Sequence, residues 1–313
     1  MTSNVPAPSP RSPLTVVIKW GGFVKLSHTV FALPFALASM VVAARAQRGW
    51  PGWSTFGLIL AAMVSARTCA MAFNRIVDHR FDRDNPRTAR RHLPTGEISV
   101  ASAWLLCILS GGAFIAVTAL INRVCFLLSP VALFLVCFYS LTKRFTDFTH
   151  VYLGIALALA PIGAWLAVKG GLVLWPMPDS AVLPFLLAAA VVFWLVGFDI
   201  IYALQDYEFD RAKGLHSLVV RWGPANALQA AFLSHLVMWG VLAAFGLLSG
   251  FRVPYFVGLL IILASLLLEH WLARRRSLKW IDTAFFRLNA LISVVFLTVV
   301  VAEVAIPPFR LLR

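Results

Sequence analysis

The stretch Val182-Leu-Pro-Phe-Leu-Leu-Ala-Ala-Ala-Val-Val-Phe-Trp-Leu-Val-Gly-Phe198 contains no charged residue. Residues 124–142, 253–268 and 288–302 are uncharged as well. A helix needs about 20 predominantly apolar residues to cross the hydrocarbon core of a bilayer. The whole chain of 313 residues is 60% hydrophobic and 13% charged, whereas soluble domains average about 45–50% apolar and about 25% charged residues. The composition excludes an ordinary soluble domain and predicts an all-α, polytopic membrane protein.

Turn residues and charges between the apolar runs divide the chain into about nine candidate transmembrane helices, which we expect to form a bundle around a central cavity. They cover residues 26–44, 54–74, 99–120, 124–142, 150–168, 182–204, 226–248, 253–272 and 286–306. We expect residues 19–313 to form a single transmembrane domain. Residues 1–18 lack the basic, apolar and small-residue succession of a signal peptide, which predicts a disordered cytoplasmic tail.

Lysine and arginine residues orient this bundle. Loops 75–98, 143–149, 205–225 and 273–285 hold six, two, three and four of them, which together is more than the connections on the other side hold. By the positive-inside rule we expect these loops and the N-terminus to be cytoplasmic and the C-terminus to lie outside, with the protein in the inner (plasma) membrane. This topology accounts for most of the net charge of +14, so we expect no nucleic-acid partner. We expect the four cysteines to be buried apolar residues.

Acidic residues are rare in this chain and unevenly placed. Six of the 13 lie in two short windows, one after the second candidate span and one after the sixth. They are Asp78, Asp82, Asp84, Asp206, Glu208 and Asp210. For one window alone, solvated acids that balance nearby arginines would be an equally good interpretation. Two windows with matched spacing at helix ends favour a site.

The first window reads Asn74-Arg-Ile-Val-Asp78-His-Arg-Phe-Asp82. On a helix that continues from the second span, Asn74, Asp78 and Asp82 would line one face. The second window repeats the four-residue spacing with Asp206 and Asp210. Carboxylate and amide oxygens are ligands that Mg²⁺ prefers, with phosphate oxygens and water completing its coordination. The two windows therefore predict a two-metal Mg²⁺ clamp for a diphosphate, with these five residues as ligands and the four aspartates catalytic.

Basic residues flank both windows, and guanidinium forks suit phosphate oxygens. The expected diphosphate contacts are Arg87, Arg90, Arg91, Lys143 and Lys213. Some of the flanking arginines can instead be topological anchors. Lys143 ends a span and can equally be an anchor that extends to the membrane surface. Its neighbours Tyr139 and Arg144 favour a site in which Lys143 is catalytic.

Asp199 lies in the otherwise apolar stretch from Phe193 to Tyr202. An ionisable group at membrane depth is a candidate site residue because burying it unpaired is expensive. On a regular helix Asp199 would share a face with Asp206 and Asp210. His28 lies near the cytoplasmic end of the first span, where a capping or packing histidine is as good an interpretation as a substrate ligand.

The first window resembles the first aspartate motif of the UbiA-type intramembrane prenyltransferase family. Asn74-x3-Asp78-x3-Asp82 is followed by Arg87-Thr-Ala-Arg-Arg-His-Leu-Pro94-Thr-Gly96, similar to the family's Arg-Thr…Arg-Pro…Gly segment. The chain departs from the family at two places. Arg75 stands where many relatives carry an acid, and His-Leu-Pro replaces Arg-Pro, which leaves Arg90 or Arg91 as the phosphate contact.

The later motifs resemble the same family in the same order. Tyr139-x3-Lys143-Arg144 is similar to its Tyr-x3-Lys element, and Asp199-x2-Tyr202-Ala-x2-Asp206-x3-Asp210 is similar to its second aspartate motif. The stretch Gly197-Phe-Asp-Ile-Ile-Tyr-Ala-Leu-Gln-Asp206 resembles the bacterial branch called 4-hydroxybenzoate polyprenyltransferase-like. Some members of that branch are assigned to prenylation of a naphthoate-type ring in the futalosine route.

The resemblance implies Mg²⁺-assisted transfer of a polyprenyl group from an allylic diphosphate to an aromatic ring. The implied acceptor is 4-hydroxybenzoate or a hydroxynaphthoate, in ubiquinone or menaquinone biosynthesis. The implied partners are the polyprenyl diphosphate, the small aromatic acceptor and the lipid bilayer, and no protein partner is expected. The expected acceptor-binding residues are Arg144, Tyr139, Asp199, Tyr202 and His28.

Two alternatives remain at this point, and the sequence argues against a third. Another UbiA-type acceptor, such as haem, chlorophyllide or phosphoribose, is one. An ion-coupled transporter could use Asp199 and Lys143, but the acids cluster on one side and the other side offers only Asp179 and Glu303. A CDP-alcohol transferase would need an Asp-Gly pair, which the chain lacks.

Overall fold

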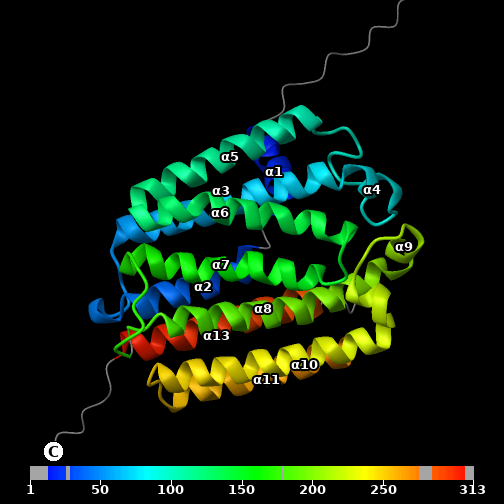
Figure 1. Ribbon diagram of the computed structural model, residues 1–313. Coiled ribbons are helices and arrows are strands. Elements are labelled where there is room, and N and C mark those ends of the chain that lie inside the picture. Colours follow the sequence, from blue (N-terminus) through cyan, green and yellow to red (C-terminus); the bar gives the residue numbers. More distant parts are fainter. Residues whose placement is uncertain (1–12, 26–28, 178, 275–283, 307–313) are drawn as a thin grey trace, which may run out of the picture.

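The computed structural model describes residues 13–25, 29–177, 179–274 and 284–306, and every regular element within these ranges is helical. Figure 1 shows the long helices lying side by side with nearly parallel axes. Eight of the described helices are long and apolar enough to cross a membrane, and Phe31–Ala43 is a shorter apolar helix. The prediction of an all-α bundle of about nine transmembrane helices is confirmed.

The principal helices are α2 (Thr29–Ala43), α3 (Trp53–Val77), α5 (Val100–Ile121), α6 (Arg123–Phe138), α7 (Thr149–Lys169), α8 (Val182–Ala203), α10 (Leu218–Leu248), α11 (Val253–Ala273) and α13 (Asn289–Ala305). The shorter elements are α1 (Pro13–Phe23), η2 (Arg45–Gln47), α4 (His79–Asp84), η3 (Tyr139–Arg144), η4 (Leu204–Asp206), α9 (Tyr207–Ala212) and η5 (Ala284–Leu288).

Polar side chains start several of these helices. The side-chain oxygens of Ser99, Asn122 and Ser217 each accept a hydrogen bond from the first turn of α5, α6 and α10, respectively. Such caps satisfy backbone N–H groups that have no partner within the helix. They are valuable here because an unsatisfied backbone group is costly in or near a bilayer.

The centre of the bundle is α8, which packs against α7 and α10 and is buried along most of its length. The helices α3, α5 and α6 have few buried residues, as expected of helices that face lipid. An aromatic core joins α2, α8 and α13. The Phe35 ring lies 4.9 Å from the Trp194 ring and 4.7 Å from the Phe296 ring, between centroids. Aromatic pairs at such separations add to the free energy gained by burial.

Two predicted boundaries differ from the structure. The helix α10 begins at Leu218 rather than at residue 226, but Gly223 interrupts it with φ of 78° and ψ of 159°, just before Pro224. Glycine adopts this conformation readily, and proline cannot donate the helical hydrogen bond. The helix α1 begins at Pro13, inside the segment that the sequence suggested was a disordered tail. Its Phe23 is buried against α3, so an apolar contact orders this stretch.

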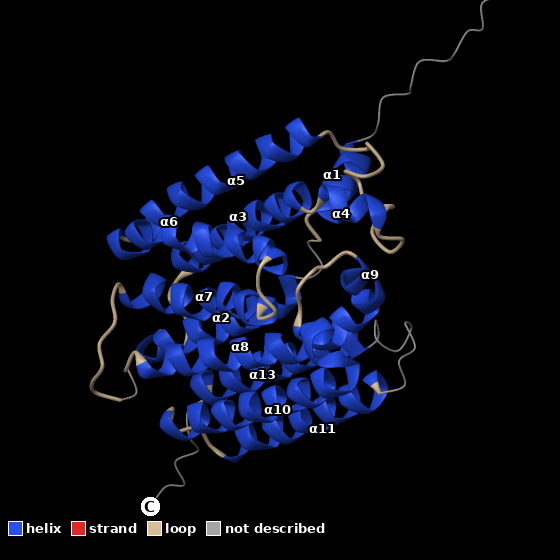
Figure 2. Cartoon of the chain, turned by 45° about the vertical axis from the view of Figure 1, so that its right-hand side comes forward, coloured by secondary structure: helices blue, strands red, loops and turns tan. Residues whose placement is uncertain are grey.

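The two acidic windows lie at the same end of the bundle. In Figure 1 the short helices α4 and α9 lie at the right-hand end, and Figure 2 keeps them there after rotation. They follow α3 and α8, whose C-terminal ends meet at this end. The C-terminal end of α13 lies at the opposite end of the bundle (Figure 1). The fold therefore brings together two motifs that are far apart in sequence.

Candidate functional site

The first window does not form one continuous helix. The helix α3 ends at Val77, and Asp78 has φ of −90° and ψ of 0° at the junction with α4. This is the bridge region of backbone conformations, where many active-site residues lie. The predicted stripe of oxygens survives in part, because Asn74 Nδ2 donates a hydrogen bond to Asp78 Oδ2 at 2.9 Å.

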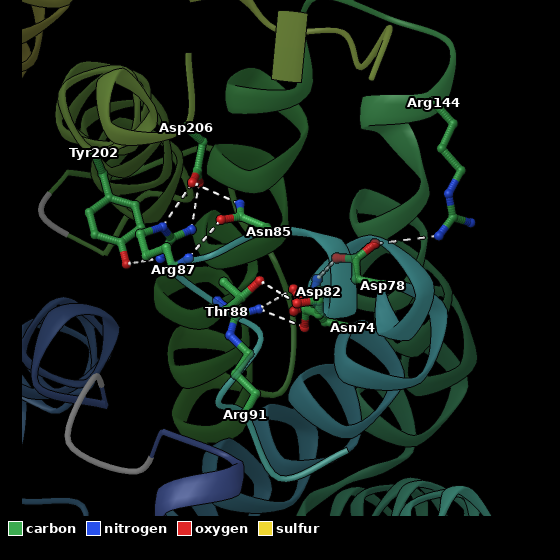
Figure 3. Close-up of polar contacts among 10 residues, drawn as sticks. All are labelled: Asn74, Asp78, Asp82, Asn85, Arg87, Thr88, Arg91, Arg144, Tyr202 and Asp206. Atoms are coloured by element: carbon green, nitrogen blue, oxygen red, sulfur yellow. Dashed lines mark hydrogen bonds and ion pairs between the residues drawn. The ribbon is translucent and has the colours of Figure 1, made fainter. Parts of the chain in front are cut away.

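The loop after α4 folds back onto the first window. Both oxygens of Asp82 accept from Arg91 Nη1, at 2.7 and 2.8 Å, and the Thr88 hydroxyl donates to the Asp82 carbonyl at 3.1 Å. Figure 3 shows these contacts beside Asn74 and Asp78. Asp82 is buried, so its charge needs a partner of this kind.

Arg87 ties this loop to the second window. Its Nε donates to Asp206 Oδ1 at 2.8 Å, its Nη2 donates to Asp206 Oδ2, and its Nη1 donates to the Tyr202 hydroxyl at 2.9 Å (Figure 3). Asn85 Nδ2 adds a bond to Asp206 Oδ1 at 3.1 Å. A bidentate contact between guanidinium and carboxylate fixes the relative orientation of the two groups and also neutralises their charges. The two windows are therefore one structural unit.

The third predicted element lies between the windows. Lys143 Nζ donates to Asp210 Oδ2 at 3.3 Å. Arg144 Nη2 donates to the Val77 carbonyl at 2.6 Å and lies 3.4 Å from Asp78 Oδ1. Both basic residues end η3, a short 3-10 helix that follows α6. Each of the four window aspartates predicted as metal ligands thus contacts one cation.

These residues line a cavity of about 300 Å³. The expected site residues in its wall are Asn74, Asp78, Asp82, Arg87, Arg91, Tyr139, Lys143, Arg144, Asp199, Tyr202, Asp206 and Asp210. The helix that carries Asp199 ends at Ala203, and η4 and α9 follow, so Asp199, Asp206 and Asp210 are not on one regular helix. They nevertheless face the same cavity.

Two of the expected residues are elsewhere, and a third is not described. Arg90 is exposed and does not line the cavity, so the structure favours Arg91 between these two candidates. Lys213 is exposed, and its Nζ donates to Asp84 Oδ2 at 2.6 Å in a separate hollow next to the cavity. His28 lies outside the described residues.

Asp78 is a window carboxylate whose charge the protein compensates only in part. Burial raises its pKa to about 6, the neighbouring Asp82 adds to the shift, and Lys143 and Arg144 only partly offset it. A bound cation would favour the ionised form. No group of three His, Cys, Asp or Glu side chains in the described part of the chain is arranged to hold a metal by itself. The carboxylate and amide oxygens of the two windows fit Mg²⁺, which takes one or two carboxylates and completes its coordination with phosphate and water.

Sequence reasoning missed three residues in or behind the cavity wall. Arg67 on α3 lines the cavity, and Asn85 bonds to Asp206. His150 is fully buried, and its Nδ1 lies 2.6 Å from Asp199 Oδ2. An arginine within a span, seven residues before Asn74, was a detectable signal because that spacing returns to the same helix face. A histidine at the start of an apolar span was a weaker one.

A second, apolar cavity of about 290 Å³ adjoins the first. The two cavities share Arg67, Met71, Tyr139 and Leu157, so a polar chamber meets an apolar one inside the bundle. The rest of the apolar wall comes from α3, α5, α6 and α7, with Ala32 of α2.

A helical membrane bundle with two paired aspartate windows around one cavity defines the class of intramembrane prenyltransferases. Residues 32–291 match the UbiA prenyltransferase family, and the chain belongs to that family as an integral membrane protein. A 4-hydroxybenzoate octaprenyltransferase from Aromatoleum aromaticum is 31% identical over 261 residues, which are 83% of this chain and 85% of that protein.

Solved structures agree with this assignment. The apo structure of a UbiA homolog from Aeropyrum pernix K1 has a TM-score of 0.77 and 31% identity, and the match covers 88% of this chain and 98% of that one. A UbiA homolog from Archaeoglobus fulgidus, bound to GPP and Mg²⁺, has a TM-score of 0.67 and 25% identity over 90% of this chain and 99% of that one. The membership argues against the transporter alternative.

The contrast between Arg91 and Arg90 gives a direct test of the site. We expect Arg91→Ala to weaken Mg²⁺-dependent binding of inorganic diphosphate roughly 10- to 100-fold, the value of a lost charge-assisted hydrogen bond. Arg90→Ala is the matched control and should leave the Kd unchanged, because its side chain is exposed. Isothermal titration calorimetry in detergent measures both. Equal losses in the two variants would contradict the assignment.

Proposed function

We propose that this protein transfers a polyprenyl group from an allylic diphosphate to a small aromatic acid, with Mg²⁺ as cofactor. The observation that carries the proposal is the joining of two cavities. One holds the paired aspartates, lysine and arginines that suit a metal–diphosphate, and the other is apolar and suits an isoprenoid chain. The homologue named 4-hydroxybenzoate octaprenyltransferase and the homologue bound to GPP and Mg²⁺ support it.

The metal-binding residues of the proposal are Asn74, Asp78, Asp82, Asp206 and Asp210. When bound, Mg²⁺ would neutralise charge on the departing diphosphate. Three basic residues, Arg87, Arg91 and Lys143, contact these carboxylates and line the same cavity, where they would donate hydrogen bonds to the phosphate oxygens. Lys213 and Arg90 lie outside the cavity wall, and we assign them no contact with the diphosphate.

The acceptor would lie between the diphosphate and the apolar cavity. We assign its carboxylate to Arg144 and its ring to the wall that holds Tyr139, Asp199 and Tyr202. The faces of the Tyr139 and Tyr202 rings would stabilise an allylic cation through their quadrupoles. A role for His28 stays a prediction. The named relatives favour 4-hydroxybenzoate, and thus ubiquinone biosynthesis, over a hydroxynaphthoate of menaquinone biosynthesis or another acceptor.

We propose that residues 19–313 form one domain in the inner membrane, with the site and the N-terminus on the cytoplasmic side and the C-terminus outside. The support is the excess of Lys and Arg in the loops at the site end. A water-soluble aromatic acid could then reach the cavity from the cytoplasm.

Metal removal tests the proposed chemistry. We expect EDTA to abolish transfer of a geranyl group from GPP to 4-hydroxybenzoate, and Asp78→Ala to lower kcat at least about 100-fold because one metal ligand and its charge are lost. Asp179→Ala is the matched control and should retain activity, since Asp179 pairs with Lys169 at the end of α7 remote from the cavity. Mass spectrometry detects the product. Full activity in chelator would refute the metal mechanism.

The apolar cavity can be blocked at Gly163. A Cβ at this position would meet no atom within 4 Å, so a larger side chain can enter the cavity that Gly163 lines. We expect Gly163→Phe to lower kcat/KM for an octaprenyl diphosphate about 10-fold or more while GPP is still used, because only the long chain needs the filled volume. Gly112→Phe on the exposed face of α5 is the control. If both donors are affected equally, the chain lies elsewhere.

The orientation can be read by cysteine labelling in intact cells. With the native cysteines replaced, Asp179→Cys should react with a membrane-impermeant maleimide added outside. Arg90→Cys should react only after the inner membrane is opened, because the loops at the site end are expected to face the cytoplasm. The reverse pattern would invert the proposed topology.

A further inference from the structure

One carboxylate in the cavity wall has a partner unlike the others. The described aspartates of the wall that contact an arginine or lysine are Asp78 with Arg144, Asp82 with Arg91, Asp206 with Arg87 and Asp210 with Lys143. Asp199 instead contacts an imidazole, with 2.6 Å between His150 Nδ1 and its Oδ2. The contact is about as short as those of Arg87 and Arg91, but the chemistry of the partner is different.

The packing of α7 against α8 places this pair. Gly154 lies one turn after His150, and a Cβ there would be 3.0 Å from both Cα and the carbonyl oxygen of Val192 on α8. The missing side chain lets the two helices approach closely. His150 is fully buried by this approach, whereas the Asp199 side chain keeps 22% of its surface exposed in the cavity wall. The imidazole is therefore behind the carboxylate, away from the space where a ligand fits.

The surroundings of the imidazole fix its form. His150 Nε2 is buried and has no hydrogen-bond partner among the described residues. A proton on Nε2 would therefore be a buried donor without an acceptor, which is unfavourable. In the neutral ring the proton is then on Nδ1, from which it is donated to Asp199. The His150–Asp199 pair then carries one negative charge, whereas a pair of aspartate with arginine or lysine carries none.

We propose that His150 is a positioning residue that holds the ionised Asp199 carboxylate toward the acceptor, so that Asp199 takes the proton which the aromatic ring releases. This inference rests on the proposed function and deepens it. The allylic C–O bond breaks and its electron pair leaves on the diphosphate. A ring carbon supplies the pair for the new C–C bond. The ring C–H bond then breaks, its electrons restore aromaticity, and its proton passes to Asp199.

The other groups near Asp199 are less suited to this role. Lys143 lies close enough to interact electrostatically with Asp199, but it is a cation that already donates to Asp210. The Tyr202 hydroxyl, one helical turn away, accepts a hydrogen bond from Arg87. A carboxylate held by a neutral donor keeps both its charge and its direction, which is what proton acceptance requires.

Ring-deuterated acceptor tests the inference in the purified full-length protein with Mg²⁺ and GPP. We expect His150→Leu to lower kcat about 10- to 100-fold, as loss of a supporting hydrogen bond does, without changing the KM for GPP. We also expect 4-hydroxybenzoate deuterated beside its hydroxyl-bearing carbon to react with a larger isotope effect in His150→Leu than in wild type, because proton removal has become slow. A residue that only supports the fold would not raise the isotope effect.

Further variants separate positioning from folding. His150→Asn should restore most of the rate and the wild-type isotope effect, because its amide nitrogen can stand where Nδ1 stood. The matched control is His216→Leu, which breaks a similar pair with Asp147 (3.0 Å) outside the cavity wall and should change neither quantity. In an Asp199→Asn background, His150→Leu should cost nothing more, since coupled residues are not additive.

Each other outcome overturns the inference. An unchanged isotope effect in His150→Leu, no rescue by His150→Asn, or additive losses with Asp199→Asn would each remove the positioning role. Loss of Mg²⁺-dependent GPP binding in His150→Leu would make the residue structural. These failures leave the proposed function standing. Wild-type protein that prenylates no aromatic acid would overturn the proposed function, and this inference with it.

Discussion

The double contact between Arg87 and Asp206 is the interaction on which the site depends. It joins the loop that follows α4 to η4, which follows α8, and the two residues are 119 positions apart in sequence. Without it, a carboxylate that is nearly inaccessible to water would lose its main partner at the edge of the membrane. The same guanidinium reaches the Tyr202 hydroxyl. One residue thus fixes the relative placement of both aspartate motifs and one wall of the cavity.

Much of the fold could be predicted because the bilayer imposes simple rules. A span must be apolar for about 20 residues and must satisfy its own backbone hydrogen bonds, so α5, α7 and α11 begin and end within a residue or so of the predicted ranges. The start of α10 was harder to predict. Gly223 and Pro224 indicate a break, but they do not indicate that the chain is helical both before and after it. The ordering of α1 depends on the burial of Phe23 by a distant segment, which no local pattern reveals.

The site was predictable to the extent that it lies in motifs. The spacing of Asn74, Asp78 and Asp82 indicated a metal–diphosphate site even though the helix assumed for it is broken at Asp78. The pairings were not predictable, because Arg90 and Arg91 are neighbours in sequence and only the fold of the loop decides which faces inward. His150 was hidden for a related reason. Its importance comes from the approach of α7 to α8 at Gly154, a tertiary contact with no sequence signature of its own.

The pairing of each window aspartate with a cation has a consequence for how ligands enter. Taken as ion pairs, these contacts leave little net charge beside a medium of low dielectric constant. Arg87, Arg91 and Lys143 can exchange a carboxylate for a phosphate oxygen while the carboxylates exchange the same cations for a metal. Ligand binding is then an exchange of counter-ions, in which each ion pair within the protein is replaced by an ion pair with the ligand. The metal and the diphosphate can therefore enter and leave without exposing an unpaired charge to the membrane interior. Such an unpaired charge would otherwise be the main contribution to the free-energy barrier for ligand entry.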